Sequence, residues 1–489
     1  MKTKLKYILI LLITATTFSC DDYVDIEAEG FVIPYTVDEL QQVLNEEYVQ
    51  ANSTYAATFF TNDDFIIPVS KQTDFRGAFV YHFYWENIYG FEDHFYSIEE
   101  TDGAWSYNYE AIGIANYVLD KLELIDDGSE DNRNNVKGEA LVIRASAYYN
   151  LINLYSKHPA AIDPETPESG VPLLTEFANP DADLTRASIQ EVYDLIISDL
   201  TTAAPLINDS AKPGGEKTFA SMAAAYGLLS RAYLQIGEYQ LALNAANSAL
   251  ALQSDLLTYS TDLVELNNTL GDPTGLLRPQ YYNPKEIIMH RRGNSTPFYV
   301  RSAFIGGVFQ TVIKKFSYLS DDLVSIFDQT YDMRYTKLTE SETGLRRWKG
   351  GDSAYPYNLT DLTVPEVMLN RAEANARLNN VSEALIDINT LREHRFTATA
   401  PTSVVNLTAS SPEEALTIVK DERRRELLGR GIRSFDIKRY NAVDGDNISI
   451  IHTNFQGEEV TLEANSNKWA MPIPRKEIFL APEISQNPR

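Results

Sequence analysis

Two stretches of this sequence repeat one helix–turn–helix pattern, and this repeat constrains the fold more than any other feature. In the first stretch, residues 225–252, small residues such as Ala242 recur at fixed places, and Gly237 stands at the break between the two halves. The second stretch, residues 367–395, follows the same order with Asn379 in place of the turn glycine. Small residues at fixed places let two antiparallel helices pack closely, so each stretch predicts a helical hairpin.

The spacing is that of the tetratricopeptide unit, a helical pair of about 34 residues. Residues 253–366 separate the two units, so they do not form a regular solenoid. Residues 141–155 place apolar side chains on most faces and predict a further, well-buried helix. The fold class that follows is mainly α, with tetratricopeptide-like helix pairs within about residues 103–252 and 364–430.

Two segments lack this helical pattern and are expected to be loop-rich insertions, residues 59–102 and 255–330. Between residues 59 and 109, 16 of 51 positions are aromatic, well above the 11% of the whole chain. The second segment combines aromatics with glycine and proline, which favour turns. Such aromatics either pack the loops onto the scaffold or offer a surface to a ligand. Trp105 and Tyr109, spaced along a predicted helix, are expected to be core residues.

The first twenty residues indicate export and lipid attachment. Three lysines precede a short apolar run at residues 7–13, which cannot span a bilayer because spanning needs about 20 residues. This is the pattern of a secretory signal peptide. Cys20, the only cysteine of the chain, stands at its end. We therefore expect residues 1–19 to be removed and Cys20 to carry a lipid. An ordinary signal peptide with a chance cysteine is the alternative.

The charge of the chain argues against some partners. The formal net charge is −27, and removal of residues 1–19, which carry three lysines and no acid, leaves −30. So acidic a protein is repelled by nucleic acid and by anionic membrane surfaces. The sequence holds no HExxH, phosphate-binding glycine loop or GxSxG motif, and we expect no catalytic residue, cofactor or metal. Paired carboxylates for glycoside hydrolysis have no sequence signature, so a surface-anchored glycan hydrolase stays the alternative function.

Arginines and acids are densest in residues 421–440, DERRRELLGRGIRSFDIKRY. One interpretation is an anion-binding site. The other is a helix whose acids and arginines pair, for example Asp421 with Arg425 at i,i+4, and hold the next segment in place. The second interpretation is favoured, because so acidic a chain has little use for an exposed basic site.

Four blocks of the sequence resemble the hallmark blocks of RagB/SusD outer-membrane lipoproteins, and they occur in the family's order. They are GEALVIRASAYYNLINLY with GVPLL, VPEVMLNRAEANARL with EALIDINTLR, ERRRELLGRGIRSFDIKRY, and MPIPRKEIFLAPEISQNP. The resemblance spans essentially the mature chain, residues 20–489, which is expected to form a single domain. The stretch YSKHPAAID departs from the family, which commonly has a Tyr-Gly turn there.

The resemblance implies a scaffold of four tetratricopeptide-like helix pairs with an irregular, loop-rich ligand-binding face. Proteins of this family are lipid-anchored in the outer membrane and exposed at the cell surface, where they form a lid on a SusC-like TonB-dependent transporter. They bind oligosaccharides, or oligopeptides in the RagB branch, deliver them to the pore for nutrient uptake, and are not enzymes. Asp21 and Asp22 resemble the surface-export signal of such lipoproteins.

The resemblance also places the ligand, in the loop after a short stretch, here TNDDF, and in the long insertion between helix pairs. The matching segments, residues 75–96 and 281–299, are expected to converge on one side. Sugars present apolar ring faces edged by hydroxyls, which aromatic side chains and nearby polar groups can bind. The candidate polar contacts are Asp74 and Arg76. The candidate ligand-contacting aromatics are Phe79, Tyr81, Tyr84, Trp85, Tyr281, Tyr282, Phe298 and Tyr299.

Overall fold

The described part of the chain contains the helical regions predicted from the sequence. The computed structural model describes residues 34–45, 55–78, 82–100, 102–208, 219–262, 284–289, 317–348 and 362–489. The expected signal peptide and Cys20 lie outside these residues. Within them, no helix has both the length and the apolar character that crossing a membrane requires.

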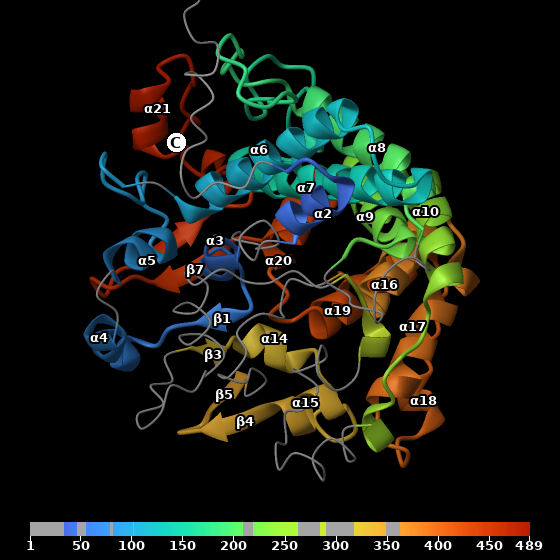
Figure 1. Ribbon diagram of the computed structural model, residues 1–489. Coiled ribbons are helices and arrows are strands. Elements are labelled where there is room, and N and C mark those ends of the chain that lie inside the picture. Colours follow the sequence, from blue (N-terminus) through green and yellow to red (C-terminus); the bar gives the residue numbers. More distant parts are fainter. Residues whose placement is uncertain are drawn as a thin grey trace, which may run out of the picture.

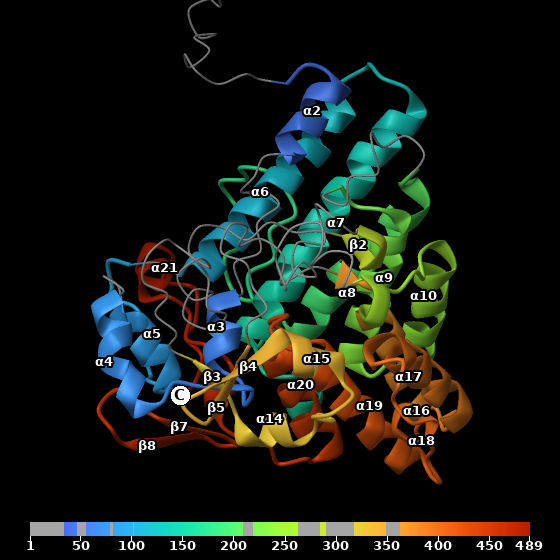
Figure 2. The same ribbon diagram turned by 90° about the horizontal axis from the view of Figure 1, so that it is seen from below.

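A continuous array of helices curves along one side of the molecule from α6 to α17, and α19 packs against its last two helices (Figures 1 and 2). Its members are α6 (Gly103–Leu124), α7 (Glu130–Tyr155), α8 (Ile189–Leu206), α9 (Met222–Ile236), α10 (Tyr239–Leu252), α16 (Val364–Arg377), α17 (Val381–Arg395) and α19 (Pro412–Glu426). Each helix packs against the next one named, so α10 contacts α16 although residues 253–363 separate them in the sequence. The predicted mainly α fold with tetratricopeptide-like helix pairs is confirmed.

Both predicted hairpins form, and each turns at a left-handed residue. Gly237, between α9 and α10, has φ of 83°. Asn379, between α16 and α17, has φ of 64°. Glycine adopts this conformation without steric cost, and asparagine tolerates it better than most other residues. The substitution of Asn for Gly therefore preserves the turn in the second unit.

Helix starts and ends follow the capping residues that the sequence contains. Ser188 and Glu191 form a capping box before α8, in which the Ser188 hydroxyl accepts from the Glu191 N–H at 3.2 Å and Glu191 Oε2 accepts from the Ser188 N–H at 2.8 Å. Ser411 caps α19, with Pro412 in the first turn. After α19, Gly429 has a positive φ of 75°, which ends the helical path.

Small residues bring the repeat helices into contact, as the pattern predicts. Ala232, Ala242 and Ala246 are completely buried. Gly227 on α9 faces Leu362, and a Cβ at position 227 would lie 2.7 Å from Leu362 Cδ2. A side chain larger than hydrogen at this position would push the two segments apart.

The remaining elements are shorter, and α3 to α5 lie on the side away from α10 and α17 (Figures 1 and 2). The helices are α2 (Val37–Leu44), α3 (Tyr55–Phe60), α4 (Val69–Ala78), α5 (His82–Tyr89), α14 (Asp321–Ser325), α15 (Met333–Leu338), α18 (Thr402–Val405), α20 (Arg433–Arg439) and α21 (Arg475–Leu480). The strands pair antiparallel as β1 (Phe65–Ile66) with β3 (Tyr318–Leu319), β2 (Ile287–Met289) with β6 (Leu362–Thr363), β4 (Thr339–Glu342) with β5 (Leu345–Trp348), and β7 (Ile450–Thr453) with β8 (Glu459–Leu462). Helices α4 and α5 lie within residues 59–102, which were expected to be loop-rich, so this part of the prediction is corrected.

The arginines of α19 are buried and paired, which supports the packing interpretation of this charged stretch. Arg423 pairs with Asp436 at 2.7 Å, and Arg424 pairs with Asp64 at 2.8 Å. The expected ion pair of Arg425 with Asp421 is wrong, because Arg425 Nη2 pairs with Glu422 at 2.7 Å. The charge of Arg425 still opposes the rise in the pKa of Asp421 that burial causes. Arg424 through Asp64, Arg423 through Asn370 and Arg425 through the Ile326 carbonyl also join segments that are far apart in the sequence, so the stretch does not present a basic surface.

Candidate ligand-binding surface on helices α4 and α5

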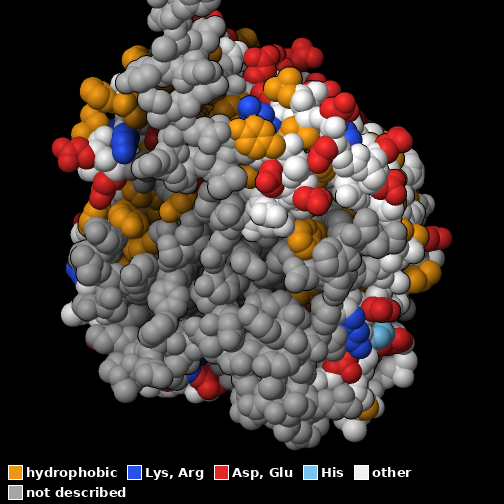
Figure 3. All heavy atoms as spheres, in the orientation of Figure 1, with side chains coloured by type: hydrophobic (Ala, Val, Ile, Leu, Met, Phe, Trp, Pro, Cys, Tyr) orange, Lys and Arg blue, Asp and Glu red, His pale blue; other side chains and the backbone are white. Residues whose placement is uncertain are grey.

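Helix α5 divides its aromatic side chains between the core and the surface. Trp85, Ile88 and Tyr89 recur at i, i+3 and i+4 and are buried, with 3% or less of each residue exposed. Phe83 points the opposite way and is 40% exposed, while Tyr84 is half-buried beside it. Figure 3 shows hydrophobic side chains at the surface in the region of α5. The helix therefore has one face for packing and another that is open to a ligand.

The buried aromatics form a layer beneath this surface. The Trp85 ring stacks on Phe60 with 5.6 Å between centroids, and Phe75 of α4 contacts Phe455 at 5.1 Å. Below α5 the His452 ring stacks on Tyr89 at 3.9 Å. Trp85 is thus a core residue, which corrects its assignment as a ligand contact. Much of the aromatic excess of this segment serves packing, one of the two explanations open from the sequence.

A row of rings continues from the exposed Phe83 toward the scaffold through the partly buried Tyr84 and Tyr96. Phe83 and Tyr84 lie 5.2 Å apart, and Tyr84 lies 5.3 Å from Tyr96, measured between ring centroids. The Tyr96 hydroxyl donates to Asp102 Oδ1 at 3.1 Å, and Asp102 caps the start of α6. The row of rings is therefore fixed to a helix of the array rather than held on a free loop.

The two polar candidates lie on α4. Arg76 donates through Nε and Nη2 to both carboxylate oxygens of Glu86, at 2.7 and 2.6 Å, and so ties α4 to α5. Its side chain is still 41% exposed. Asp74 is exposed one turn away from Ala78, the last residue of α4. Both side chains can reach a ligand at the surface, and Arg76 is already oriented by its carboxylate partner.

The TNDDF segment that precedes α4 is anchored by ion pairs. Asp63 binds Arg433 through two contacts of 2.8 Å, and Asp64 binds Arg424. Burial raises the pKa of Asp64 even though Arg424 opposes it; for Asp63, burial is outweighed by Arg433, so the pKa of this carboxyl is lowered. The backbone N–H of Ser320 donates to Asp64 O at 2.8 Å, next to the pairing of β1 with β3.

This pairing bears on the predicted convergence of the two ligand segments. Strand β1 precedes α4, and β3 follows the second ligand segment, residues 281–299, so parts of the two insertions outside the ligand segments meet. The remaining candidates lie outside the described residues; they are Phe79, Tyr81, Tyr281, Tyr282, Phe298 and Tyr299. Convergence of the segments themselves stays a prediction.

Phe83 and Tyr96 are not among the predicted contacts, although the sequence holds a signal for Phe83. If residues 82–89 are taken as a helix, Trp85, Ile88 and Tyr89 make one apolar stripe and Phe83 falls opposite to it. The signal was hidden because aromatic residues also occupy the open face, so the segment shows no polar and apolar alternation.

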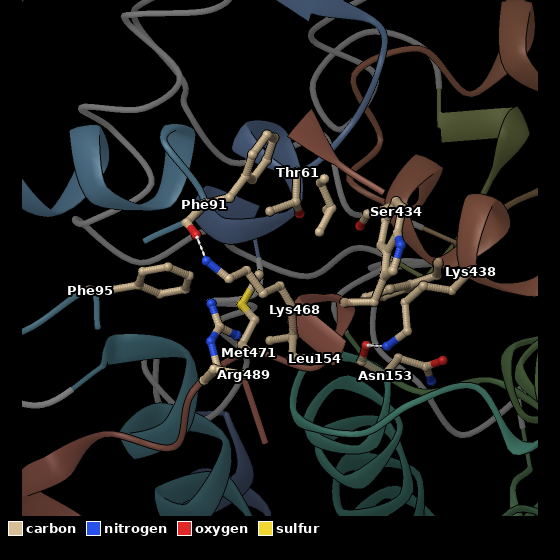
Figure 4. Close-up of a pocket in the computed structure, with 13 residues that line it drawn as sticks. Thr61, Phe91, Phe95, Asn153, Leu154, Ser434, Lys438, Lys468, Met471 and Arg489 are labelled. Carbon is tan, nitrogen blue, oxygen red and sulfur yellow. Dashed lines mark hydrogen bonds between the residues drawn. The ribbon is translucent and has the colours of Figure 1, made fainter. Parts of the chain in front are cut away.

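A cavity beneath this region is too small for a sugar (Figure 4). Its volume is about 10 Å³, the space of a single water molecule. Lys438 lines it and donates to the carbonyls of Asn153 and Ser156, while Lys468 donates to the carbonyl of Phe91. These lysines fix chain segments to one another, so the candidate site is the outer surface and not this cavity.

Comparisons with known proteins identify the family. Residues 22–234 match a family model described as "Starch-binding associating with outer membrane", and residues 329–489 match the model of the SusD family. Together with the helical scaffold, these matches show that the chain belongs to the SusD/RagB family, whose members are associated with the outer membrane.

Individual relatives agree along nearly the whole chain. SusD-like protein P25 of Formosa agariphila is 22% identical, over 98% of this chain and 97% of its own. The solved structure of a SusD superfamily protein from Bacteroides thetaiotaomicron gives a TM-score of 0.69 at 23% identity, covering 93% of this chain and 100% of that one. Surface glycan-binding protein A from Bacteroides uniformis gives 0.68 at 16% identity, covering 92% and 98%.

Proposed function

We propose that this protein is a cell-surface lipoprotein that binds oligosaccharides and delivers them to a partner TonB-dependent outer-membrane transporter of the SusC type. Family membership supports the outer-membrane setting. The names of two similar structures, a putative sugar binding protein from Bacteroides vulgatus and the B. uniformis glycan-binding protein, support a glycan as the ligand.

The observation that carries the proposal is the exposed ring of Phe83 on a helix that is fixed on its other face. A sugar ring would stack on this side chain and displace water from both apolar surfaces. The Arg76 guanidinium and the Asp74 carboxylate, both on α4, supply the hydrogen-bonding groups that hydroxyls require. Because α4 and α5 are held by Glu86 and by the aromatic layer, little order has to be gained on binding.

Two alternatives to this proposal are a peptide as the ligand and hydrolysis of a glycan as the activity. A peptide could use the same rings, as the RagB branch of the family implies. A glycan hydrolase would need two carboxyl groups roughly 5–10 Å apart across a bound sugar. The acidic residues nearest Phe83 on α5 and α4 are Glu86, which is bonded to Arg76, and Asp74. Both carboxylate oxygens of Glu86 accept hydrogen bonds from Arg76, so this residue is not placed to serve a bound sugar, which favours binding over hydrolysis.

The test is a screen of the purified mature protein against amylopectin, xylan, laminarin and a peptide library, with binding and product release followed in the same samples. The proposal expects binding of at least one glycan with no shortening of it. Release of smaller sugars would favour the hydrolase, and binding of peptides alone would favour the peptide function. Co-purification of a barrel transporter with the membrane-bound protein tests the partner.

A further inference from the structure

A second exposed aromatic lies well away from α5, on a loop that the described scaffold holds in place. Phe177 is 46% exposed and belongs to the loop between α7 and α8, seen at the top of Figure 1. Its ring meets Tyr117 of α6 edge to face, with 4.8 Å between centroids. Tyr117 follows the start of α6 by 14 residues, which is about 21 Å along the helix axis.

Hydrogen bonds tie this loop to the helical array, one to the exposed Asp120 of α6 and others through the buried Asn116 and Arg144. The Phe177 N–H donates to Asp120 Oδ2 at 2.9 Å, and Asn116 donates to the carbonyl of Leu174 at 2.9 Å. Arg144 donates to the Asn116 side chain at 2.9 Å and is itself paired with Asp199. Because these hydrogen bonds fix the backbone of the loop, the Phe177 ring cannot move into the core and stays at the surface.

Two backbone features beside the rings cost folding free energy, and the packing of the described residues does not account for the glycine. Ala178 has φ of 48°, a left-handed conformation that alanine rarely adopts. Gly113 lies one turn before Tyr117 in the middle of α6, where glycine weakens a helix relative to alanine. Packing does not require this glycine, because a Cβ built on it has no atom within 4 Å. Gly113 leaves open space next to the face of α6 that carries Tyr117.

The polar groups around the rings fit a neutral sugar. Lys121 lies 5.8 Å from the centre of the Tyr117 ring, and Asn179 donates to Glu176 at 2.9 Å. Ammonium and amide N–H groups can donate to sugar hydroxyls, and carboxylate and amide oxygens can accept from them. The carboxylates of Asp120 and Glu176 would repel sulfated or uronic sugars.

We infer that Phe177, Tyr117 and the open backbone at Gly113 form a second carbohydrate-binding platform, separate from the α4–α5 surface and selective for neutral glycans. The inference rests on the proposed function, because it assigns a further site for the same class of ligand. A polysaccharide long enough to occupy both sites would bind more tightly than a short oligosaccharide.

The test compares variants of the full mature chain in affinity electrophoresis through gels containing amylopectin, xylan or laminarin. Phe177→Ala is expected to weaken binding of the retained polysaccharide about five- to thirtyfold, the effect of losing one stacked ring. Gly113→Gln fills the open space with a good helix former, so it is expected to keep or raise the melting temperature and still weaken binding. Phe479→Ala removes a ring that is 72% exposed on α21 and is the matched control, expected to leave binding unchanged.

Each outcome separates the platform from the proposed function. Weaker binding in both Phe177→Ala and Gly113→Gln supports the platform. Unchanged binding in these two variants, with loss in Phe83→Ala, overturns the platform and leaves the proposed function standing. Loss of transporter association without loss of glycan binding would also overturn it, because the rings would then serve a protein contact. If no polysaccharide retards the wild-type chain, the proposed glycan-binding function is overturned, and the platform that rests on it is overturned with it.

Discussion

Replacement of Arg424 by alanine tests whether the arginine-rich stretch is structural. Arg424 contacts Asp64 at 2.8 Å, Asp322 at 2.6 Å and Asp63 at 3.2 Å. Asp63 would keep Arg433 as an ion-pair partner, and the side chain of Asp322 is 77% exposed to water. The loss of Arg424 should therefore cost little free energy at either carboxylate. Asp64 is only 2% exposed and would be left with Arg433 at 4.0 Å. The cost is therefore that of one uncompensated buried carboxylate.

Breaking a buried pair from one side costs about 3–5 kcal/mol. For a chain of this length the entropy of unfolding is about 1 kcal/mol per degree, so Arg424→Ala should lower the melting temperature by about 3–5 °C. Guanidinium unfolding followed by circular dichroism measures the free energy directly. The matched control is Lys137→Ala, which breaks an exposed pair of 3.7 Å with Glu123 and should cost less than about 0.5 kcal/mol.

A second substitution shows whether the loss comes from Asp64. In the Arg424→Ala background, Asp64→Asn removes the unpaired charge and should restore part of the stability. Stability within about 1 kcal/mol of wild type, together with loss of ligand or anion binding in Arg424→Ala, would refute the structural interpretation and favour the anion site instead.

Three further predictions follow from the same structure. Burial lowers the pKa of His452 to about 4, below the ordinary value of about 6.5 that is expected in the unfolded chain. The free energy of unfolding should therefore reach its full value above pH 6.5 and fall by about 3 kcal/mol as the pH drops to 4. His452→Gln can still donate to the Tyr89 carbonyl and should lack this part of the pH dependence, and an unchanged profile would contradict the assignment. Trp85→Ala should cost about 3–5 kcal/mol of folding free energy, because the side chain is buried against Phe60; a stable variant that loses only ligand binding would return Trp85 to the site. Cys20→Ala should release the protein from membranes or stall its processing, assayed in cells without the transporter so that tethering cannot mask the effect, and undiminished membrane association would argue against lipidation.

Local signals in the sequence predicted the scaffold because each acts over a few residues. Gly237 marks a left-handed turn, Ser188 and Glu191 mark a helix start, and alanines at fixed places mark close helix contacts. Even Asn379, a departure from the repeat, keeps the backbone conformation that the glycine would have supplied. Such rules depend on neighbours in the sequence and so can be applied before the fold is known.

The candidate surface could be predicted only in outline, because its details depend on long-range contacts. Helix α5 was missed since aromatic residues occupy both its faces and conceal the helical period. Which face is buried depends on Phe60 and on His452, which lies 363 residues from its hydrogen-bond partner Tyr89. Likewise, Arg424 finds Asp64 360 residues away rather than a neighbour on its own helix. Helical spacing alone predicts ion-pair partners for the arginines of α19 that lie on the same helix.

The most direct test of the binding surface is the affinity of Phe83→Ala for the glycan that the screen selects, measured by isothermal titration calorimetry. Because Phe83 is 40% exposed and faces away from the core, this variant should fold like the wild type and lose about 1–2 kcal/mol of binding free energy, a five- to thirtyfold weaker affinity. Phe83→Tyr keeps the ring and should bind almost as the wild type does. Wild-type affinity in Phe83→Ala would contradict the assignment of α5 as the place where the sugar is bound.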